Sequence, residues 1–188
     1  MPAARPRRIV LLSGWLKSGK DTVGEYLCRA HGFRRLAFAD ALKDEVSETY
    51  GIPRDLLDSQ DGKDLPVGSS GQTVRDLLIR HGQWRRSQDP AYWIHKVLRE
   101  IQQATGHIVI TDWRFPHEFD VIDSAVGGGA EKWRVQRWAA PPKLDESEVA
   151  LDSMQFGVTL ANTGTLADLY AQVDSHMGAL SGRCSSFE

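Results

Sequence analysis

The stretch Ile9–Thr22 reads IVLLSGWLKSGKDT. Its first part is a continuous run of β-branched and leucine residues, which is typical of a parallel strand buried on both faces. Its second part has the spacing Gly-x4-Gly-Lys from Gly14 to Lys20, and a helical pattern follows. A strand, a glycine-rich turn and a helix in this order are the setting of a phosphate-binding loop. The stretch therefore predicts an α/β protein whose first loop binds phosphate groups.

The loop residues have distinct expected roles. Gly14 and Gly19 permit a curled backbone whose N–H groups, with the positive end of the following helix, point at phosphate oxygens. Lys20 then reaches the β- and γ-phosphates of a nucleotide. Asp21 occupies the position of the usual Ser or Thr ligand of Mg²⁺, so Asp21 or Thr22 is expected to hold the ion. The alternative for Asp21 is an acidic residue favoured in a first helical turn.

The remaining segments alternate between strand-like and helical patterns. This alternation predicts a three-layer α/β fold, the P-loop NTPase fold, with a mostly parallel sheet. The 188 residues are expected to form a single domain, 1–188, with a flexible tail at about 181–188. Strands are expected at 7–13, 33–39, 107–113, 131–138 and 156–162, and helices at about 21–30, 40–51, 73–81, 92–104, 115–126 and 166–180.

Two of the connections carry more specific expectations. Asp40 is expected to cap the helix that ends near Gly51. The stretch 58–71, DSQDGKDLPVGSSG, is rich in Gly, Asp and Ser. It is expected to be a mobile connection that can close over a ligand.

The strand expected at 107–113, HIVITDW, ends with Asp112. Ligands of open α/β sheets bind at the carboxyl ends of the strands, where this carboxylate is able to reach a metal ion. The alternative for Asp112 is a cap of the next turn. Arg114, two residues later, is expected near the same edge. Most arginines are solvated surface residues, but Arg75 and Arg114 stand out because they lie in motif-like surroundings, and guanidinium groups suit a monophosphate bidentately.

Composition excludes several classes of function. A net charge of −2 argues against polymeric nucleic acid and anionic membranes as partners. The apolar run at 9–12 is too short for a membrane span or a signal peptide. Cys28 and Cys184 have no paired spacing, so a disulfide framework is not expected and a reducing cytoplasm fits.

The histidines show no spacing of metal ligands, and no serine lies in a nucleophile-elbow pattern. The sequence therefore offers no evident general base. If the acceptor is a nucleotide monophosphate, none is needed, because the second pKa of a phosphate monoester is about 6 and the attacking oxygen is already largely ionised near neutral pH. Catalysis then rests on alignment and on charge neutralisation by Lys20, arginines and Mg²⁺.

Eight motifs extend over most of the chain. They are GWLKSGKDT, LAFADALK, TVRDLLIRHGQWRR with DPAYWI, ITDWRFPHEF, GGGAEKWRVQR, ESE and LANTGTLADL. In this order they resemble the deoxynucleoside monophosphate (dNMP) kinases of tailed bacteriophages over about residues 8–173. The resemblance implies an adenylate-kinase-like fold with a small helical acceptor-binding and lid region at about 40–105. It also implies transfer of the ATP γ-phosphate to a dNMP with Mg²⁺, in the cytoplasm of a host cell.

The resemblance also assigns residues to roles. It implies that Gly14, Lys17, Gly19, Lys20, Asp21 and Thr22 bind the ATP phosphates, and that Leu42, Lys43 and Arg75 bind the acceptor. It assigns Arg114 to the acceptor phosphate, Arg137 to a lid-like position and Ser147–Glu148 to a base or sugar contact. The expected catalytic residues are Lys20, Arg114 and Arg137, and the expected metal ligands are Asp21, Thr22 and Asp112.

The sequence departs from the family pattern at several positions. Trp15 and Trp113 replace smaller or aliphatic residues, and no histidine precedes the Ser147–Glu148 pair. Base preference, lid detail and a possible homodimer stay open. Two other functions fit the same loop: a phosphomevalonate or dephospho-coenzyme A kinase, and a non-enzymatic switch that binds a nucleotide to change shape.

Overall fold

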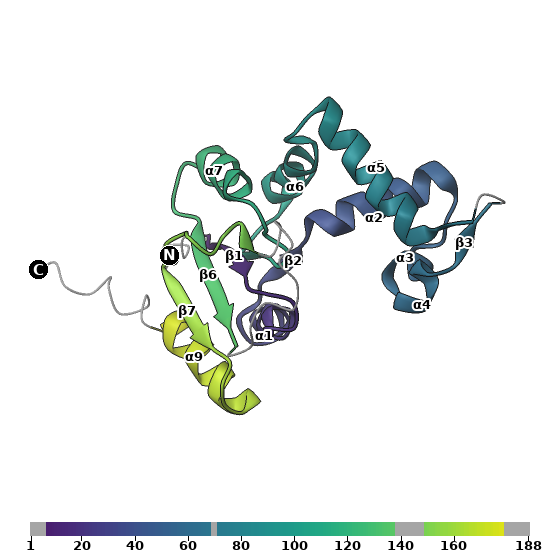
Figure 1. The fold of residues 1–188 in the computed structure, drawn as a ribbon. Helices are drawn as coiled ribbons and strands as arrows, with labels where there is room; N and C mark the ends of the chain where they lie inside the picture. The colour runs from purple at the N-terminus through teal and green to yellow at the C-terminus, as the bar shows by residue number, and fades with distance from the viewer. Residues whose placement is uncertain (1–6, 69–70, 138–148, 179–188) are drawn as a thin grey trace, which may run out of the picture. The chain divides into compact units, whose positions relative to one another are not determined.

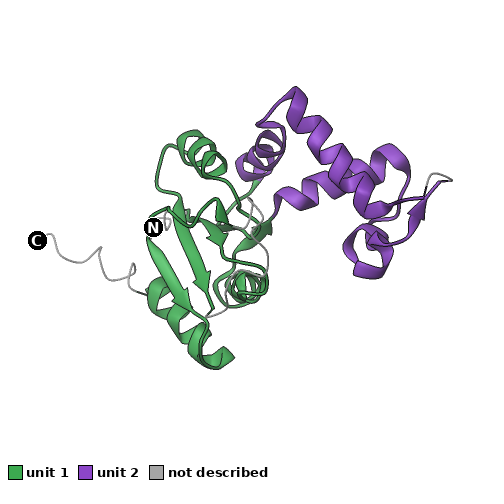
Figure 2. Cartoon of the chain, viewed as in Figure 1, with its two compact units in different colours: residues 1–36, 104–188 green, residues 37–103 purple. Residues whose placement is uncertain are grey.

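The computed structural model describes residues 7–68, 71–137 and 149–178. The chain divides into two compact units (Figure 2). Unit 1 comprises residues 1–36 and 104–188, and unit 2 comprises residues 37–103. Ser147 and Glu148, like the expected tail at 181–188, lie outside the described residues.

Unit 1 contains a five-stranded sheet in the order β2-β5-β1-β6-β7, in which every neighbouring pair is parallel (Figure 1). The expected α/β fold class is thereby confirmed. The strands are β1 (Ile9–Ser13), β2 (Arg34–Leu36), β5 (Ile108–Ile110), β6 (Glu131–Gln136) and β7 (Val158–Ala161). The helices are α1 (Lys20–His31), α7 (Pro116–Ala125) and α9 (Leu166–Gly178).

The central strand β1 is buried at every position, as its unbroken apolar run predicts. Leu11 lies opposite Ile110 of β5 and Lys132 of β6. Alternate residues of each strand, such as Val10 and Leu12 of β1, form a core cluster with side chains of α1 and α9 on one face of the sheet. Helix α7 lies on the other face (Figure 1). The phosphate-loop turn therefore leaves the middle of a sheet that is covered on both sides.

The start of unit 2 corrects a sequence prediction. The strand expected at 33–39 ends at Leu36, and helix α2 already begins at Phe38 with an extended Ala37 as its N-cap. Phe38 and Ala41 are buried at helical spacing. Asp40 lies in the first turn, where it accepts a hydrogen bond from Arg54 at 2.8 Å, and does not cap the helix as expected.

Unit 2 is mainly helical. Its elements are α2 (Phe38–Tyr50), α3 (Arg54–Asp58), α4 (Gln60–Lys63), β3 (Pro66–Val67), β4 (Gln72–Thr73), α5 (Val74–Gln88) and α6 (Tyr92–Gln103). Helix α5 starts with a capping box formed by Thr73 and Asp76, and it continues beyond the expected end at His81. Helix α6 closely follows its expected range.

The connection expected at 58–71 contains two short elements that the sequence did not predict, α4 and β3. Its expected mobility stays a prediction. The Ser59 hydroxyl accepts a hydrogen bond from the Gly62 N–H at 3.0 Å and caps α4. Strands β3 and β4 then pair in an antiparallel ladder. A Cβ atom on Gly62 would lie 2.4 Å from the Leu56 carbonyl oxygen, so only glycine fits this turn.

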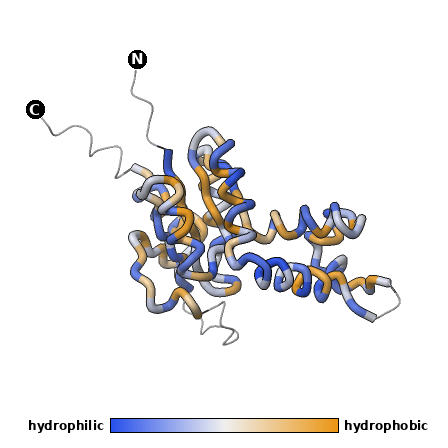
Figure 3. The backbone as a smooth tube through the Cα atoms, turned by 90° about the horizontal axis from the view of Figure 1, so that it is seen from above, coloured by the Kyte–Doolittle hydropathy of each residue, from blue (hydrophilic) through white to orange (hydrophobic). Residues whose placement is uncertain are grey.

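Apolar and polar stretches interleave along both units (Figure 3). In unit 2 the apolar side chains form their own core cluster around Val46, Leu57 and Leu77. None of the helices in the described residues combines the length and the apolar character needed to cross a bilayer.

One buried carboxylate joins the three longest helices of unit 2. Glu45 of α2 accepts hydrogen bonds from His81 (2.9 Å) and Arg85 (2.5 Å) of α5, and from Tyr92 (2.6 Å) and Lys96 (3.0 Å) of α6. Burial raises the pKa of Glu45, but the hydrogen bonds from these four partners outweigh that effect and hold the pKa at about 2. The charged carboxylate therefore stabilises the packing of the three helices.

We expect Glu45→Gln to destabilise the protein by about 2 kcal/mol at pH 7, because the cations lose their counter-charge. The folded pKa lies below the unfolded pKa, so this contribution is complete above about pH 5 and is lost as the pH falls toward 2. The difference in unfolding free energy between wild type and variant should therefore shrink over that range, which denaturant titrations at several pH values measure. Glu48→Gln, at an exposed position of α2, is the control. A difference that stays constant down to pH 2 would contradict this account.

Candidate functional site

The loop between β1 and α1 has the curled backbone that its glycines predict. Gly14 and Gly19 have φ angles of 151° and 103°, and Lys17 is the only non-glycine residue of the described chain with a positive φ, at 62°. The Ser18 N–H donates to the Trp15 carbonyl at 3.0 Å, and the Val23 N–H donates to the Gly19 carbonyl at 3.0 Å. The loop thus closes on itself and leads directly into the first turn of α1.

A side chain at either glycine would clash with neighbouring residues of the loop, of β6 or of the turn after β7. A Cβ atom on Gly14 would lie 2.6 Å from the Val135 carbonyl oxygen of β6 and 2.5 Å from the Ser18 hydroxyl. A Cβ atom on Gly19 would lie 2.5 Å from the amide nitrogen of Asn162. Because Gly19 has no side chain to cap α1, the N–H groups of the first turn stay available to an anion.

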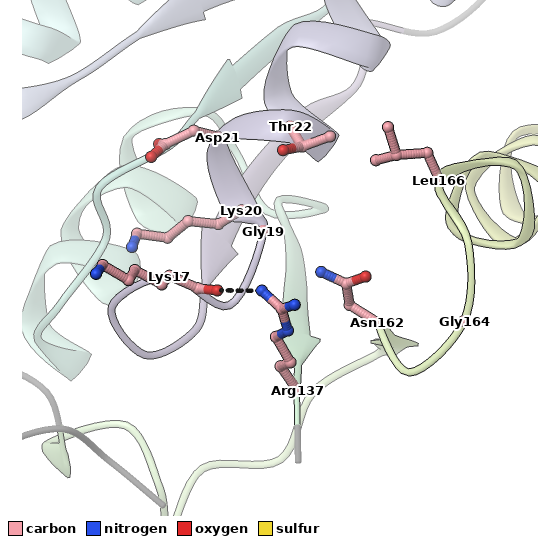
Figure 4. A pocket seen from close by; sticks show the side chains of 9 residues that line it. All are labelled: Lys17, Gly19, Lys20, Asp21, Thr22, Arg137, Asn162, Gly164 and Leu166. Carbon is pink, nitrogen blue, oxygen red and sulfur yellow. Dashed lines mark hydrogen bonds between the residues drawn. The ribbon is translucent and has the colours of Figure 1, made fainter. Parts of the chain in front are cut away.

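A cavity of about 380 Å³ opens against this loop (Figure 4). It is lined by Lys17, Gly19, Lys20, Asp21, Thr22, Arg137, Asn162, Gly164 and Leu166. Figure 4 shows the ends of Lys17 and Lys20 on one side of the loop, with Arg137 and Asn162 across from them. The Arg137 guanidinium donates to the Lys17 carbonyl at 3.5 Å. Two lysines and one arginine give the cavity a positive wall suited to phosphate oxygens.

The structure thus brings together six of the residues expected from the sequence: Lys17, Gly19, Lys20, Asp21, Thr22 and Arg137. Gly14, Asp112 and Arg114 are not among the described residues that line the cavity. Gly14 instead shapes the loop. Asp112 follows β5, the strand that pairs with β1, so Asp112 and the loop leave the same edge of the sheet.

Asn162 and Gly164 were not identified from the sequence. They belong to the turn between β7 and α9, where the Asn162 amide donates to the Ser18 carbonyl at 2.8 Å. The Asn162 N–H donates to the Gln136 carbonyl at 2.8 Å and anchors the turn to the end of β6. An Asn-x-Gly turn that follows the last parallel strand was the available signal, since such turns lie at the ligand-binding edge.

The oxygen atoms that Asp21 and Thr22 offer at the cavity are too few to surround a magnesium ion, so they suit an ion that keeps part of its water shell. The described residues contain no cluster of three or more His, Cys, Asp or Glu side chains that would hold a metal ion. Asp21 and Thr22 offer one carboxylate and one hydroxyl at the cavity. Mg²⁺ usually binds through one or two carboxylates together with water and substrate phosphates, so these residues suit it when a nucleotide is present.

The segment after β5 is fixed by the cap of α7. The Glu118 carboxylate accepts hydrogen bonds from the backbone N–H groups of Arg114 (2.9 Å) and Phe115 (3.0 Å). The indole of Trp113 donates to the Phe115 carbonyl at 2.8 Å. This segment, which carries Asp112 and Arg114, is therefore held by several bonds.

Unit 2 holds a separate group of cations. Lys43 pairs with Asp58 at 2.7 Å, and Arg75 pairs with Asp64 at 2.9 Å. The Lys63 ammonium donates to the Asp58 carbonyl at 3.3 Å, so Lys43 and Lys63 both contact Asp58. Burial lowers the pKa of Lys63, and the charges of Lys43 and Arg75 lower it further. Lys63 was not identified from the sequence, because a single lysine in a turn-rich stretch gives no signal.

Leu42 packs against the core of unit 2. An expected acceptor residue is therefore also a packing residue. Its role toward a ligand stays a prediction, as do those of Lys43 and Arg75.

No known family profile matches the sequence, whereas solved kinase structures match in fold. Shikimate kinase from Aquifex aeolicus superposes with a TM-score of 0.53 at 13% identity, over 93% of this chain and 99% of that chain. Dephospho-CoA kinase from Campylobacter jejuni gives 0.53 at 12% identity, over 93% and 97% of the two chains. The protein TT1252 from Thermus thermophilus gives 0.51 at 18% identity, over 95% and 100%. The chain therefore has the fold of the small-molecule P-loop kinases, as the sequence predicts.

We expect Asn162→Ala to weaken ATP binding about fivefold. The variant loses one hydrogen bond to the loop, which is worth about 1 kcal/mol. Calorimetric titration with ATP measures the change.

The matched control is Gln172→Ala. Gln172 braces the same turn through the Ala161 backbone at 2.9 Å and does not line the cavity. This control should change the Kd for ATP less than twofold. Equal weakening in both variants would mean that the turn, and not the bond to the loop, determines binding.

Proposed function

From the P-loop kinase fold and the geometry of the cavity, we propose that this protein is a kinase that transfers the γ-phosphate of ATP to a dNMP, giving dNDP and ADP. The observation that carries the proposal is the convergence of Lys17, Lys20, Asp21, Thr22 and Arg137 on one cavity at the N-terminus of α1. Phosphate-gripping loops in this fold place a lysine at the β- and γ-phosphates.

The cavity suggests how ATP lies in it. The phosphates lie on the N–H groups of the loop and of the first turn of α1. The base then extends toward Gly164 and Leu166 at the other end of the cavity. Leu166 is 58% exposed although it is apolar, which suits a residue that covers the face of a purine.

Asp21 and Thr22 are the proposed magnesium ligands at the loop, and Asp112 is a further candidate from the adjacent strand edge. When bound, Mg²⁺ neutralises charge on the β- and γ-phosphate oxygens. The single carboxylate at the loop leaves the remaining coordination positions to phosphate oxygens and water.

The proposed reaction needs alignment more than proton transfer. An oxygen of the acceptor phosphate forms a bond to the γ-phosphorus, while the bond from that phosphorus to the bridging oxygen breaks and ADP takes the electron pair. The attacking oxygen is already ionised near neutral pH, because its pKa is about 6. Lys20 and Arg137 neutralise the charge that develops on the transferred group.

The proposed acceptor site lies among the cations of unit 2. Lys43 and Lys63 both contact Asp58, Lys43 through the carboxylate and Lys63 through the carbonyl, and Arg75 pairs with the Asp64 carboxylate. A doubly charged phosphate monoester is a stronger partner for these cations than the aspartates are. That the acceptor is a deoxynucleotide is supported by the resemblance of the motifs, above all TVRDLLIRHG, which carries Arg75.

Two alternatives differ in what they predict. A kinase for dephospho-coenzyme A or phosphomevalonate needs a larger acceptor pocket and would not turn over dNMPs. A nucleotide-binding switch would hydrolyse ATP slowly, and no acceptor would accelerate it.

We expect Lys20→Ala to lower transfer to dNMPs by roughly 10²- to 10³-fold, because the transferred phosphate loses a cation that stabilises the transition state. A coupled assay of ADP formation measures this loss, and thermal unfolding checks that the variant folds. Lys17→Ala, which removes the other lysine of the loop, should lose less activity. Near-normal turnover by Lys20→Ala would remove the loop from the mechanism.

We expect Arg75→Ala to raise the KM for the dNMP by roughly tenfold while the KM for ATP stays nearly constant, since Arg75 is proposed to contact only the acceptor. Initial rates at varied concentrations of each substrate separate the two constants. Arg80→Ala, an exposed arginine of the same helix, is the control. A parallel rise in both KM values would argue against an acceptor role for Arg75.

A further inference from the structure

We infer that Arg134 is a positioning residue that holds the phosphate loop in register with the segment carrying Asp112. The two tryptophans that depart from the family pattern, Trp15 and Trp113, are the ends of one stack that runs through Arg134 and Phe156. The catalytic consequence rests on the proposed kinase function, whereas the structural link does not.

Arg134 is a largely shielded cation that contacts two hydrogen-bond acceptors and two aromatic rings. It lies on β6, and its side chain is only 11% exposed, unlike the solvated arginine that the sequence favours. Its guanidinium pairs with the Asp152 carboxylate and donates to the Leu151 carbonyl at 3.3 Å. The rings of Trp15 and Phe156 lie at 5.5 Å and 5.2 Å from the guanidinium carbon. These distances are those of cation–π contacts.

One end of the stack fixes the phosphate loop. The Trp15 indole donates to Asp152 at 3.2 Å, so the carboxylate that balances Arg134 also orients the ring. Trp15 directly follows Gly14, and its carbonyl accepts the Ser18 N–H that closes the loop. A fixed indole therefore restrains the first turn of the loop from outside the cavity.

The other end fixes the segment after β5. Phe156 meets Trp113 edge to face, with ring centroids 5.9 Å apart. Trp113 is 2% exposed and directly follows Asp112. The stack thus connects Trp15, which follows the first loop glycine, to Trp113, which follows the further candidate magnesium ligand Asp112.

The position of the stack argues for more than packing. A charged group at this burial costs free energy unless its partners are complete, and an apolar side chain would fill the space without that cost. Mg²⁺ demands near-ideal octahedral geometry, so small shifts between the loop and Asp112 are expected to reduce its binding. A planar cation in contact with two rings restrains both their position and their tilt.

The test compares Arg134→Met with Lys132→Met. Lys132 lies two residues earlier on β6, on the same face. Its ammonium lies 4.1 Å from the centre of the Phe119 ring, outside the Arg134 stack. The readout is the Kd for ATP by calorimetry, with Mg²⁺ and with EDTA. Arg134→Met should weaken binding of Mg–ATP on the order of tenfold and binding of metal-free ATP much less, and Lys132→Met should change neither.

Asp152→Asn is the second variant if Arg134→Met does not fold, because Asp152 is more exposed yet contacts both Arg134 and Trp15. It should shift the Kd for Mg–ATP in the same direction by about threefold. Arg134→Lys keeps the charge but not the plane, so it should restore binding only in part.

Equal effects of Arg134→Met and Lys132→Met, or equal loss with and without Mg²⁺, would overturn the inference while leaving the kinase proposal intact. A wild-type protein that binds Mg–ATP but phosphorylates no dNMP would overturn the substrate proposal, and the metal-dependent effect of Arg134→Met would still hold. A wild-type protein that binds no Mg–ATP would overturn both.

Discussion

The site depends on how closely the phosphate loop approaches the residues at the ends of β6 and β7, at one edge of the sheet. Gly14 lies against the Val135 carbonyl of β6, and Gly19 lies against Asn162 after β7, with no space for a Cβ atom at either position. This contact curls the loop and leaves the first turn of α1 uncapped toward the cavity. Strands β1, β6 and β7 bring these segments to the same edge of the sheet, because neighbouring strands are parallel.

The proposed function assigns a different requirement to each unit. In unit 1 the requirement is a positive cavity on a rigid sheet, with Lys20 and Arg137 at its wall. In unit 2 the requirement is a set of helices that keeps cations close together in spite of their repulsion. The buried Glu45 carboxylate meets part of it by joining α2, α5 and α6. Two of the proposed acceptor cations, Lys43 and Arg75, lie on the joined helices α2 and α5.

The sequence predicted the elements that have strong local signals. The buried run at 9–13, the loop and the amphipathic α6 belong to this group. The strand predicted at 33–39 was too long, because Phe38 fits either a strand or a helix. The elements α4 and β3 within 58–71 were not predicted, because elements this short show no periodicity. Asn162 and Lys63 were not predicted as site residues, because the contacts that place them there are not local patterns. Asn162 bonds to Ser18, far away in the sequence, and Lys63 bonds to the Asp58 carbonyl across a turn. The Arg134 stack was likewise not predicted, since Trp15 lies more than a hundred residues before Arg134 and Phe156 and no local pattern links Trp113 to them.

The central claim is phosphoryl transfer to a dNMP, and the most direct test follows the phosphate itself. The purified protein would be incubated with Mg²⁺ and ATP labelled at the γ-phosphate, and with one acceptor at a time: each dNMP, each NMP, 5-hydroxymethyl-dCMP, dephospho-coenzyme A and shikimate. The account predicts label in one or more deoxynucleoside diphosphates, with less in the ribose forms. Label in dephospho-coenzyme A or shikimate products alone, or only in free inorganic phosphate, would contradict it.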